Sequence, residues 1–214
     1  MALSSFRKQL KSVSLLAARP FAALRIPPNV FTFFSVPLAL LAAFFFVQHQ
    51  FFFSWVLVVL AVLVDVLDGS VAELQDRKTV FGNYWDAVVD KVVEIIFYVG
   101  FSFSFPLASI LALGSSLLNS YAKPRVGLVI MTDNRDWPAM GERADRLLLL
   151  ILGMLAFLLV PTIAGYSTLG LTLYAIVLMT CIGTVQRVAY AKQLIEEAQR
   201  SGNVLPYLKR GKNS

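Results

Sequence analysis

Long runs of apolar residues alternate with short polar segments along most of the chain. Five of these runs are each about long enough, as helices, to cross the ~30 Å hydrocarbon core of a bilayer, and a sixth is interrupted by charged residues. We therefore predict an all-α integral membrane protein with six transmembrane helices. The predicted spans are 30–48, 51–67, 82–100, 106–122, 146–163 and 168–186.

The composition agrees with this pattern. Of 214 residues, 57% are hydrophobic and 15% are charged, and the mean hydropathy is +0.70, far from the balance of a soluble domain. The spans predict one membrane domain at 26–190, followed by a polar cytoplasmic tail at 191–214. A single Cys and a single His exclude a disulfide framework, a Cys-rich zinc site and a His-rich metal site. Any metal must therefore be bound by oxygen atoms.

Residues 1–25 have an amphipathic helical pattern. Basic and serine side chains occupy some faces, and apolar side chains recur at helical spacing at Leu3, Phe6, Leu10, Val13 and Ala17. This pattern predicts a helix that lies in the membrane interface. A mitochondrial targeting peptide is the alternative, because the segment contains Arg and Ser and has no acidic residue.

The charged residues are distributed unevenly between the two sides of the predicted membrane domain. All 19 Lys and Arg residues and all 13 acidic residues fall on the side that carries both termini. The loops on the other side, at 48–50, 101–105 and 161–167, contain none of them. The positive-inside rule then places both termini and the polar chemistry in the cytoplasm. We expect a multi-pass protein of the plasma or inner membrane that contacts membrane lipids and binds no nucleic acid.

Four aspartates lie inside the apolar segments of the second and third spans. Asp65 and Asp68 are three residues apart and Asp86 and Asp90 are four apart, so each pair projects from one face of its helix. The two helices are predicted to be antiparallel neighbours joined by a short connection, which brings both pairs to one depth near the cytoplasmic interface. Four carboxylates are expected to converge there.

Carboxylates this close together in an apolar environment repel one another and need a compensating cation. Oxygen ligands without His or Cys suit magnesium, manganese or calcium, and four carboxylates suffice to bridge two ions. Such a site indicates phosphoryl-type transfer. From the residues alone, two alternatives stay open: helix ends that face water and pair with basic side chains such as Lys91, and a divalent-cation transporter or sensor.

The spacing of the aspartates resembles the signature of the CDP-alcohol phosphotransferase family, D-x2-D-G-x2-A-R-x8-G-x3-D-x3-D. Seven of its eight fixed positions match, and Pro28–Thr32 is similar to the family's Pro-Asn-x-x-Thr entry to its first helix. Glu73 stands where the family has Arg. The matching positions are Asp65, Asp68, Gly69, Ala72, Gly82, Asp86 and Asp90.

The resemblance implies an enzyme that moves a substituted phosphate from a CDP-linked lipid to an alcohol and releases CMP. The donor would be CDP-diacylglycerol or its ether-lipid analogue, and the protein would be a homodimer. Asp65, Asp68, Asp86 and Asp90 would hold two Mg²⁺ ions, with Mn²⁺ as the alternative, and Asp90 would also be the general base. The residues implied for the nucleotide are Asn29, Thr32, Asp68, Gly69, Ala72 and Gly82.

Replacement of the family Arg by Glu73 affects the nucleotide end of this site. Arg77 would lie one helical turn further on if the helix continues, and would then supply the missing charge to the nucleotide. A changed donor preference is one alternative. A relative that binds metal and nucleotide without turnover is another.

Basic residues at three separate helix ends indicate an anion-binding site on the cytoplasmic side. Guanidinium and ammonium groups there can bind a phosphate by charge-assisted hydrogen bonds, which favours a phosphorylated polyol as the acceptor. Membrane anchoring alone is the competing explanation. The pattern is similar to the subgroup that uses inositol phosphate, and a phosphatidylglycerophosphate synthase that uses glycerol 3-phosphate is the alternative. The candidate residues are Lys123, Arg125, Arg143, Arg146 and Arg187.

Overall fold

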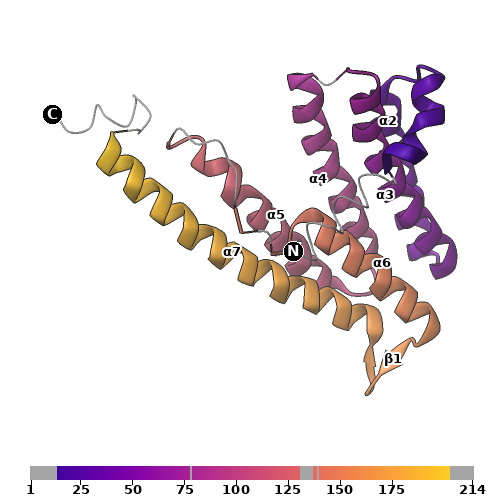
Figure 1. Ribbon diagram of the computed structural model, residues 1–214. Coiled ribbons are helices and arrows are strands. Elements are labelled where there is room, and N and C mark those ends of the chain that lie inside the picture. The colour runs from indigo at the N-terminus through magenta and orange to yellow at the C-terminus, as the bar shows by residue number, and fades with distance from the viewer. Residues whose placement is uncertain (1–13, 78, 131–136, 139, 203–214) are drawn as a thin grey trace. The chain divides into compact units, whose positions relative to one another are not determined.

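The computed structural model describes residues 14–77, 79–130, 137–138 and 140–202 (Figure 1). The chain divides into two compact units, Met1–Ser104 and Phe105–Ser214. Residues 14–23 are helical and precede the labelled elements. The elements are α2 (Pro28–Val47), α3 (Phe51–Leu74), α4 (Val80–Ser102), α5 (Pro106–Val126), α6 (Arg143–Leu159), β1 (Thr162–Ile163), β2 (Tyr166–Ser167) and α7 (Thr168–Ser201).

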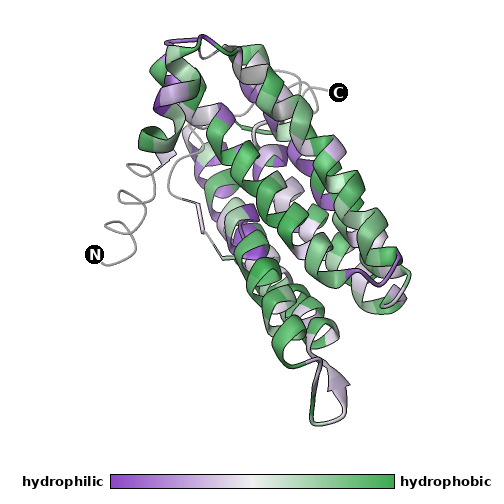
Figure 2. Cartoon of the chain, turned by 90° about the vertical axis from the view of Figure 1, so that its right-hand side faces the viewer, coloured by the Kyte–Doolittle hydropathy of each residue, from purple (hydrophilic) through white to green (hydrophobic). Residues whose placement is uncertain are grey.

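Each of the six predicted spans coincides with one of these helices, so the all-α prediction is confirmed. Figure 2 shows that hydrophobic residues cover most of the length of the helices. Among the described residues, α3 and α7 are long and apolar enough to cross a membrane. The number of membrane crossings stays a prediction.

The structure corrects the boundary at the end of the fifth span. α6 ends at Leu159, and the chain then forms a β1–β2 hairpin instead of continuing as a helix to residue 163. Ala164 and Gly165 have φ of +52° and +83°, as a tight hairpin turn requires. α7 continues to Ser201, so the first part of the polar segment at 191–214 is helical. Helix propensity does not depend on apolar character, because Lys, Gln, Glu and Arg are all good helix formers.

In the first unit, α2 packs against both α3 and α4. Gly100 on α4 allows the closest approach, because a Cβ there would lie 2.7 Å from the Cβ of Ala43 on α2. The rings of Phe46 and Phe101 meet edge to face beside it, with centroids 4.7 Å apart. α2 is therefore the helix against which the two aspartate-bearing helices are held.

The C-terminal end of α3 is fixed by a Schellman motif. The N–H of Arg77 donates to the carbonyl of Ala72 at 3.0 Å, and Asp76 has a left-handed φ of +52°. The helix therefore stops at Leu74 and does not continue to Arg77, which corrects the expectation that Arg77 lies one turn further along the same helix. Gln75 Nε2 donates to the carbonyl of Ile26 at 2.9 Å and ties this end to the chain before α2.

The predicted interfacial helix is described only from residue 14 onward, and Leu3, Phe6, Leu10 and Val13 lie outside the described residues. Its visible part, 14–23, packs through Ala18 against Phe31 and Val71. Ala18 is buried, whereas the predicted apolar position Ala17 is exposed. The buried face is shifted by one residue because it covers α3 and the start of α2.

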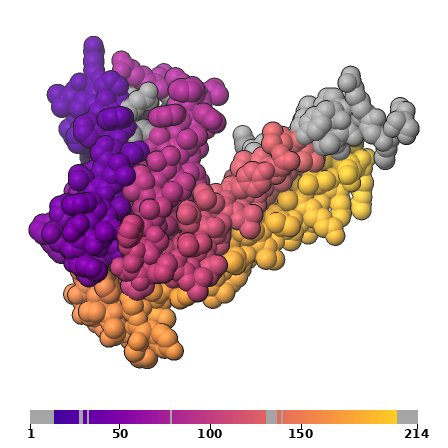
Figure 3. Space-filling view, turned by 180° about the vertical axis from the view of Figure 1, so that it is seen from behind, coloured from indigo at the N-terminus to yellow at the C-terminus, as the bar shows by residue number. Residues whose placement is uncertain are grey.

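In the second unit, α7 packs along both α5 and α6. Figures 1 and 3 show α5 and α7 side by side. Beyond the apolar part of α7, Ala198 joins a buried cluster with Val126, Ile130 and Trp137. The end of α7 that carries polar residues is thus part of the folded unit.

Candidate active site

Three aspartates from two helices form a compact cluster in the first unit. Asp65 and Asp68 of α3 and Asp86 of α4 each offer a carboxylate oxygen, and these oxygens all lie within 4.8 Å of one another. Asp65 is 9% exposed and Asp68 5%. Their three-residue spacing places both on one face of α3, as the sequence predicts.

The dimensions of this cluster suit a divalent cation. Oxygens on opposite sides of one ion lie about 4.2 Å apart for Mg²⁺ and about 5 Å apart for Ca²⁺, given metal–oxygen distances of about 2.1 Å and 2.3–2.6 Å. Three mostly buried carboxylates at this separation carry unfavourable mutual repulsion, which a cation removes. The ligand set is oxygen alone, so a hard cation fits the residues present.

Asp90 does not belong to this group of three. It is half-buried on α4, one turn beyond Asp86 and so about 6 Å further along the helix axis. The same face continues to Glu94, which is 1% exposed and lies 3.4 Å from the Nζ of Lys91. Glu94 is not among the site residues predicted from the sequence. The four-residue spacing of positions 86, 90 and 94 was the signal that marks it.

The glycines of the signature differ in their surroundings. A Cβ on Gly69, next to Asp68 in α3, would meet no atom within 4 Å. A Cβ on Gly82 would lie 2.9 Å from Oγ1 of Thr79, the N-cap side chain that accepts a hydrogen bond from the Gly82 N–H at the same distance. Packing at the start of α4 therefore explains why position 82 is a glycine. No contact within the described structure explains why position 69 is a glycine.

Of the other nucleotide candidates, Ala72 is half-buried on α3 and Arg77 is exposed beyond the end of that helix. Asn29 and Thr32 belong to α2, but their side chains lie outside the described part of the structure.

We predict that Gly69→Ala separates stability from activity. The free energy of unfolding is expected to rise by about 0.5–1 kcal/mol, because Ala favours a helix over Gly. The KM for the CDP-lipid is expected to rise several-fold, because the methyl group occupies open space beside Asp68. Thermal unfolding in detergent and a donor titration of CMP release measure the two effects.

Gly114→Ala in α5 is the matched control, since a Cβ at Gly114 also meets nothing within 4 Å. It is expected to change stability in the same direction and leave the donor KM unchanged. A normal donor KM in Gly69→Ala would argue against the nucleotide assignment.

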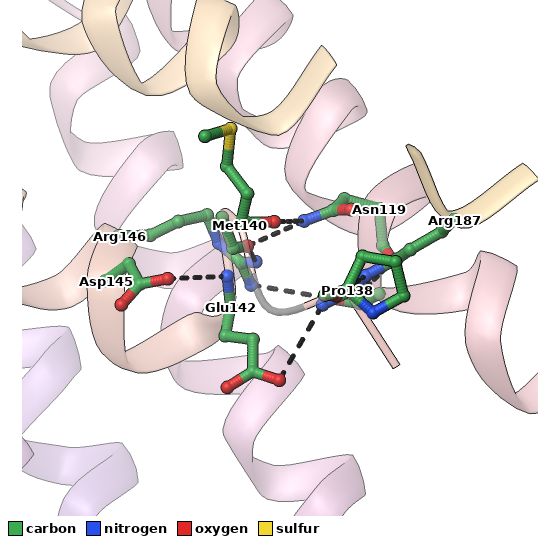
Figure 4. Close-up of polar contacts among 9 residues, drawn as sticks. Asn119, Pro138, Met140, Glu142, Asp145, Arg146 and Arg187 are labelled. Carbon is green, nitrogen blue, oxygen red and sulfur yellow. Dashed lines mark hydrogen bonds and ion pairs between the residues drawn. The ribbon is translucent and has the colours of Figure 1, made fainter. Parts of the chain in front are cut away.

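In the second unit, two buried arginines converge on the loop that precedes α6 (Figure 4). Arg146 of α6 is 1% exposed, and its Nη1 donates to the carbonyl of Gly141 at 2.6 Å and its Nη2 to Oγ of Ser120 at 3.3 Å. Arg187 of α7 donates from Nη1 to the carbonyl of Asn119 at 2.6 Å and from Nε to that of Pro138 at 3.3 Å. These bonds hold both guanidinium groups in fixed orientations.

Asn119 of α5 lies at the centre of this network, although the sequence did not predict it as a site residue. Its Nδ2 donates to the carbonyls of Gly141 at 2.6 Å and Met140 at 3.4 Å, so it ties α5 to the loop. Gly141 has a left-handed φ of +71°, and Gly183 of α7 leaves room for the Met140 carbonyl. A buried polar residue within an apolar helix was the available signal, because such a group needs internal partners.

The remaining basic candidates are less closely connected. Arg143 is half-buried at the first position of α6. Lys123 and Arg125 lie in the last turn of α5, where the helix dipole stabilises positive charge. Arg125 also lines an apolar groove between α5 and α7. The described contacts thus join Arg146 and Arg187 in one network, and not all five predicted cations.

A family model described as CDP-alcohol phosphatidyltransferase matches residues 25–182. The chain belongs to this family. The match spans the carboxylate cluster of α3 and α4 and most of the second unit, and it includes Arg143 and Arg146 but ends before Arg187. The chain is therefore a transferase, and the cation transporter or sensor that the carboxylates alone left open is set aside.

Two curated relatives with different names match different lengths of this chain. An archaetidylinositol phosphate synthase of Pyrococcus horikoshii is 26% identical over 200 residues, which cover 91% of this chain and 98% of the relative. A CDP-diacylglycerol–serine O-phosphatidyltransferase of Helicobacter pylori is 34% identical over 91 residues, which cover 39% of this chain and 38% of the relative. The match to the archaetidylinositol phosphate synthase extends over both units.

Solved structures of a family member share the fold. The phosphatidylinositol phosphate synthase of Mycobacterium tuberculosis with CDP-DAG bound has a TM-score of 0.67 and 22% identity, covering 84% of this chain and 94% of that one. Its complex with manganese and citrate has the same TM-score and 23% identity, covering 83% and 88%. The family is membrane-embedded, which agrees with the apolar character of α3 and α7.

Proposed function

We propose that this enzyme transfers a phosphatidyl or archaetidyl group from a CDP-lipid to a phosphorylated polyol, with inositol phosphate as the first candidate, and releases CMP. The observation that carries the proposal is the cluster of three aspartate oxygens within 4.8 Å in the first unit, and the two buried arginines anchored around one loop of the second unit support it. The first suits the diphosphate of the donor with its cations, and the second suits the phosphate of the acceptor.

The carboxylates of Asp65, Asp68 and Asp86 would hold the metal, with Asp90 completing the ligand set for two Mg²⁺ ions. Bound metal would neutralise charge on the diphosphate of the donor. Manganese in the related synthase supports a hard divalent cation at such a site. Gly69 and Ala72 would let the nucleotide approach the α3 backbone, and Gly82, Asn29, Thr32 and Arg77 complete the proposed nucleotide set.

Asp90 is the proposed general base. Its carboxylate would take the proton of the acceptor hydroxyl as that oxygen forms a bond to the lipid-linked phosphorus. The bond from this phosphorus to the CMP oxygen breaks, and CMP leaves. The position of Asp90 supports this role. It lies one turn after Asp86 on the same face of α4 and is not one of the three clustered aspartates.

A phosphorylated acceptor is favoured over serine or free inositol. Two buried guanidinium groups suit a phosphate dianion, which accepts several charge-assisted hydrogen bonds at once. We place Arg187, Arg146 and Arg143 in this site and retain Lys123 and Arg125 as outer members. The name of the Pyrococcus relative supports inositol phosphate, and glycerol 3-phosphate is the alternative.

The membrane arrangement is part of the proposal. All six helices would cross the membrane, with both termini and the active site in the cytoplasm and the donor's tails in the bilayer. Large apolar side chains on the outside of the helices support contact with lipid, among them Phe33, Phe52, Ile110, Leu148 and Leu178. We also propose a homodimer, as the resemblance implies.

The experiment that tests the proposal is CMP release by purified protein with Mg²⁺ and CDP-diacylglycerol or its ether analogue. Inositol phosphate, glycerol 3-phosphate, free inositol and serine are compared as acceptors. Release is expected with inositol phosphate and not with serine or free inositol. Release with glycerol 3-phosphate alone would assign the alternative acceptor, and release with serine alone would contradict a phosphorylated acceptor.

A further inference from the structure

Glu142 places a carboxylate beside one of the two buried arginines. Its Oε1 lies 3.9 Å from Nη2 of Arg187, which is beyond hydrogen-bond length. The Arg187 side chain is 6% exposed and that of Glu142 38%, so the carboxylate is the more accessible partner (Figure 4). The pair is therefore a loose ion contact at the accessible edge of a buried guanidinium group.

Arg187 does not depend on Glu142 for its orientation. Nη1 and Nε are held by the main-chain carbonyls of Asn119 and Pro138, on two different segments of the chain. Carbonyl groups fix the direction of the guanidinium plane but do not neutralise its charge. Nη2 is the nitrogen that faces an anionic group, and Glu142 supplies that group.

Glu142 also has a structural role apart from its contact with Arg187. It is the N-cap of α6 and forms a capping box with Asp145: the Asp145 carboxylate accepts from the Glu142 N–H at 3.1 Å, and the Glu142 side chain accepts from the Asp145 N–H. This interaction keeps the carboxylate at the helix N-terminus whether or not it contacts Arg187. Both members of the ion contact thus stay ordered when the contact breaks.

We propose that Glu142 is a resident anion that occupies the charged edge of Arg187 and is displaced from it by the phosphate of the acceptor. This inference rests on the proposed function, and it assigns Glu142 as a specificity-determining residue of the acceptor site. A phosphate dianion carries about twice the charge of a carboxylate and approaches to hydrogen-bond length, so it competes successfully. An acceptor with a carboxylate or no charge competes poorly with the resident group.

The test is the charge-neutral variant Glu142→Gln, which keeps a side-chain oxygen for the helix cap. The KM for inositol phosphate is expected to fall about two- to fivefold, the range that corresponds to a loose ion pair, with kcat little changed. Inorganic phosphate is expected to inhibit the variant at correspondingly lower concentration. If Glu142→Gln is not recovered folded, Glu142→Ser removes the charge and retains a favourable N-cap.

Glu196→Gln is the matched control. It removes one carboxylate from an exposed contact with Lys192 on α7, where Oε1 and Nζ lie 3.8 Å apart, without approaching Arg187. Its KM is expected to equal that of wild type. An unchanged or raised KM in Glu142→Gln, with active wild-type enzyme, overturns this inference and leaves the proposed function standing. Wild-type enzyme that transfers to no phosphorylated acceptor overturns the proposed function itself.

Discussion

Asp68→Asn is expected to reduce CMP release by about a thousandfold or more. A bound divalent cation supplies several kcal/mol of transition-state stabilisation, and each 1.36 kcal/mol corresponds to a factor of ten in rate. Asp68 is 5% exposed and shares the cluster with Asp65 and Asp86, so its substitution removes one of the three clustered carboxylates. Steady-state CMP release across a Mg²⁺ titration measures the effect.

The fold is expected to survive this substitution. Asn has nearly the shape of Asp, and loss of one charge relieves repulsion within the cluster. Asp76→Asn is the matched control, because Asp76 is exposed and its φ of +52° suits Asn. It should retain wild-type activity. Wild-type turnover in Asp68→Asn would remove the proposed metal site.

Arg187→Lys is expected to raise the KM for the phosphorylated acceptor by about ten- to a hundredfold, the equivalent of one lost charged hydrogen bond. The guanidinium group holds two main-chain carbonyls and still presents Nη2 to an anion. A single ammonium nitrogen cannot satisfy carbonyls on two segments and a phosphate with the same planar geometry. The donor KM is expected to change much less.

The control for this variant is the same exchange at the exposed end of α7, Arg200→Lys. It is expected to leave both Michaelis constants unchanged. Equal increases in the donor and acceptor KM of Arg187→Lys would indicate a general structural defect. An unchanged acceptor KM would take Arg187 out of the phosphate site.

The helices were predictable because each apolar run is long and its ends carry turn residues or charges. The hairpin at 162–167 was not, since a short apolar strand and a helix end share the same residue types. α3 ends because Asp76 adopts a left-handed conformation, where Gly is the usual residue. The sequence therefore did not predict that Arg77 lies outside the helix. α7 extends beyond its apolar part because helix propensity does not require apolar residues.

The candidate metal site was the more predictable of the two groups of candidate residues. Its ligands come from two consecutive helices at fixed spacing, so periodicity alone places Asp65 with Asp68 and sets Asp90 one turn from Asp86. The arginine network depends on a loop, and main-chain carbonyls of Asn119, Pro138 and Gly141 leave no trace in a sequence. The sequence predicted the basic residues of this network but not the carbonyl groups that bind them.

The most direct test of the proposed reaction is the composition of the lipid product. Purified enzyme with Mg²⁺, CDP-lipid and inositol phosphate is expected to form, for each CMP released, one lipid that carries two phosphorus atoms, one from the donor and one from the acceptor. Mass spectrometry of the lipid phase gives the number of phosphorus atoms in the product, and quantification of lipid and CMP gives the amount of product formed per CMP. CMP release without such a lipid, or a lipid product with a single phosphorus atom, would contradict transfer to a phosphorylated polyol.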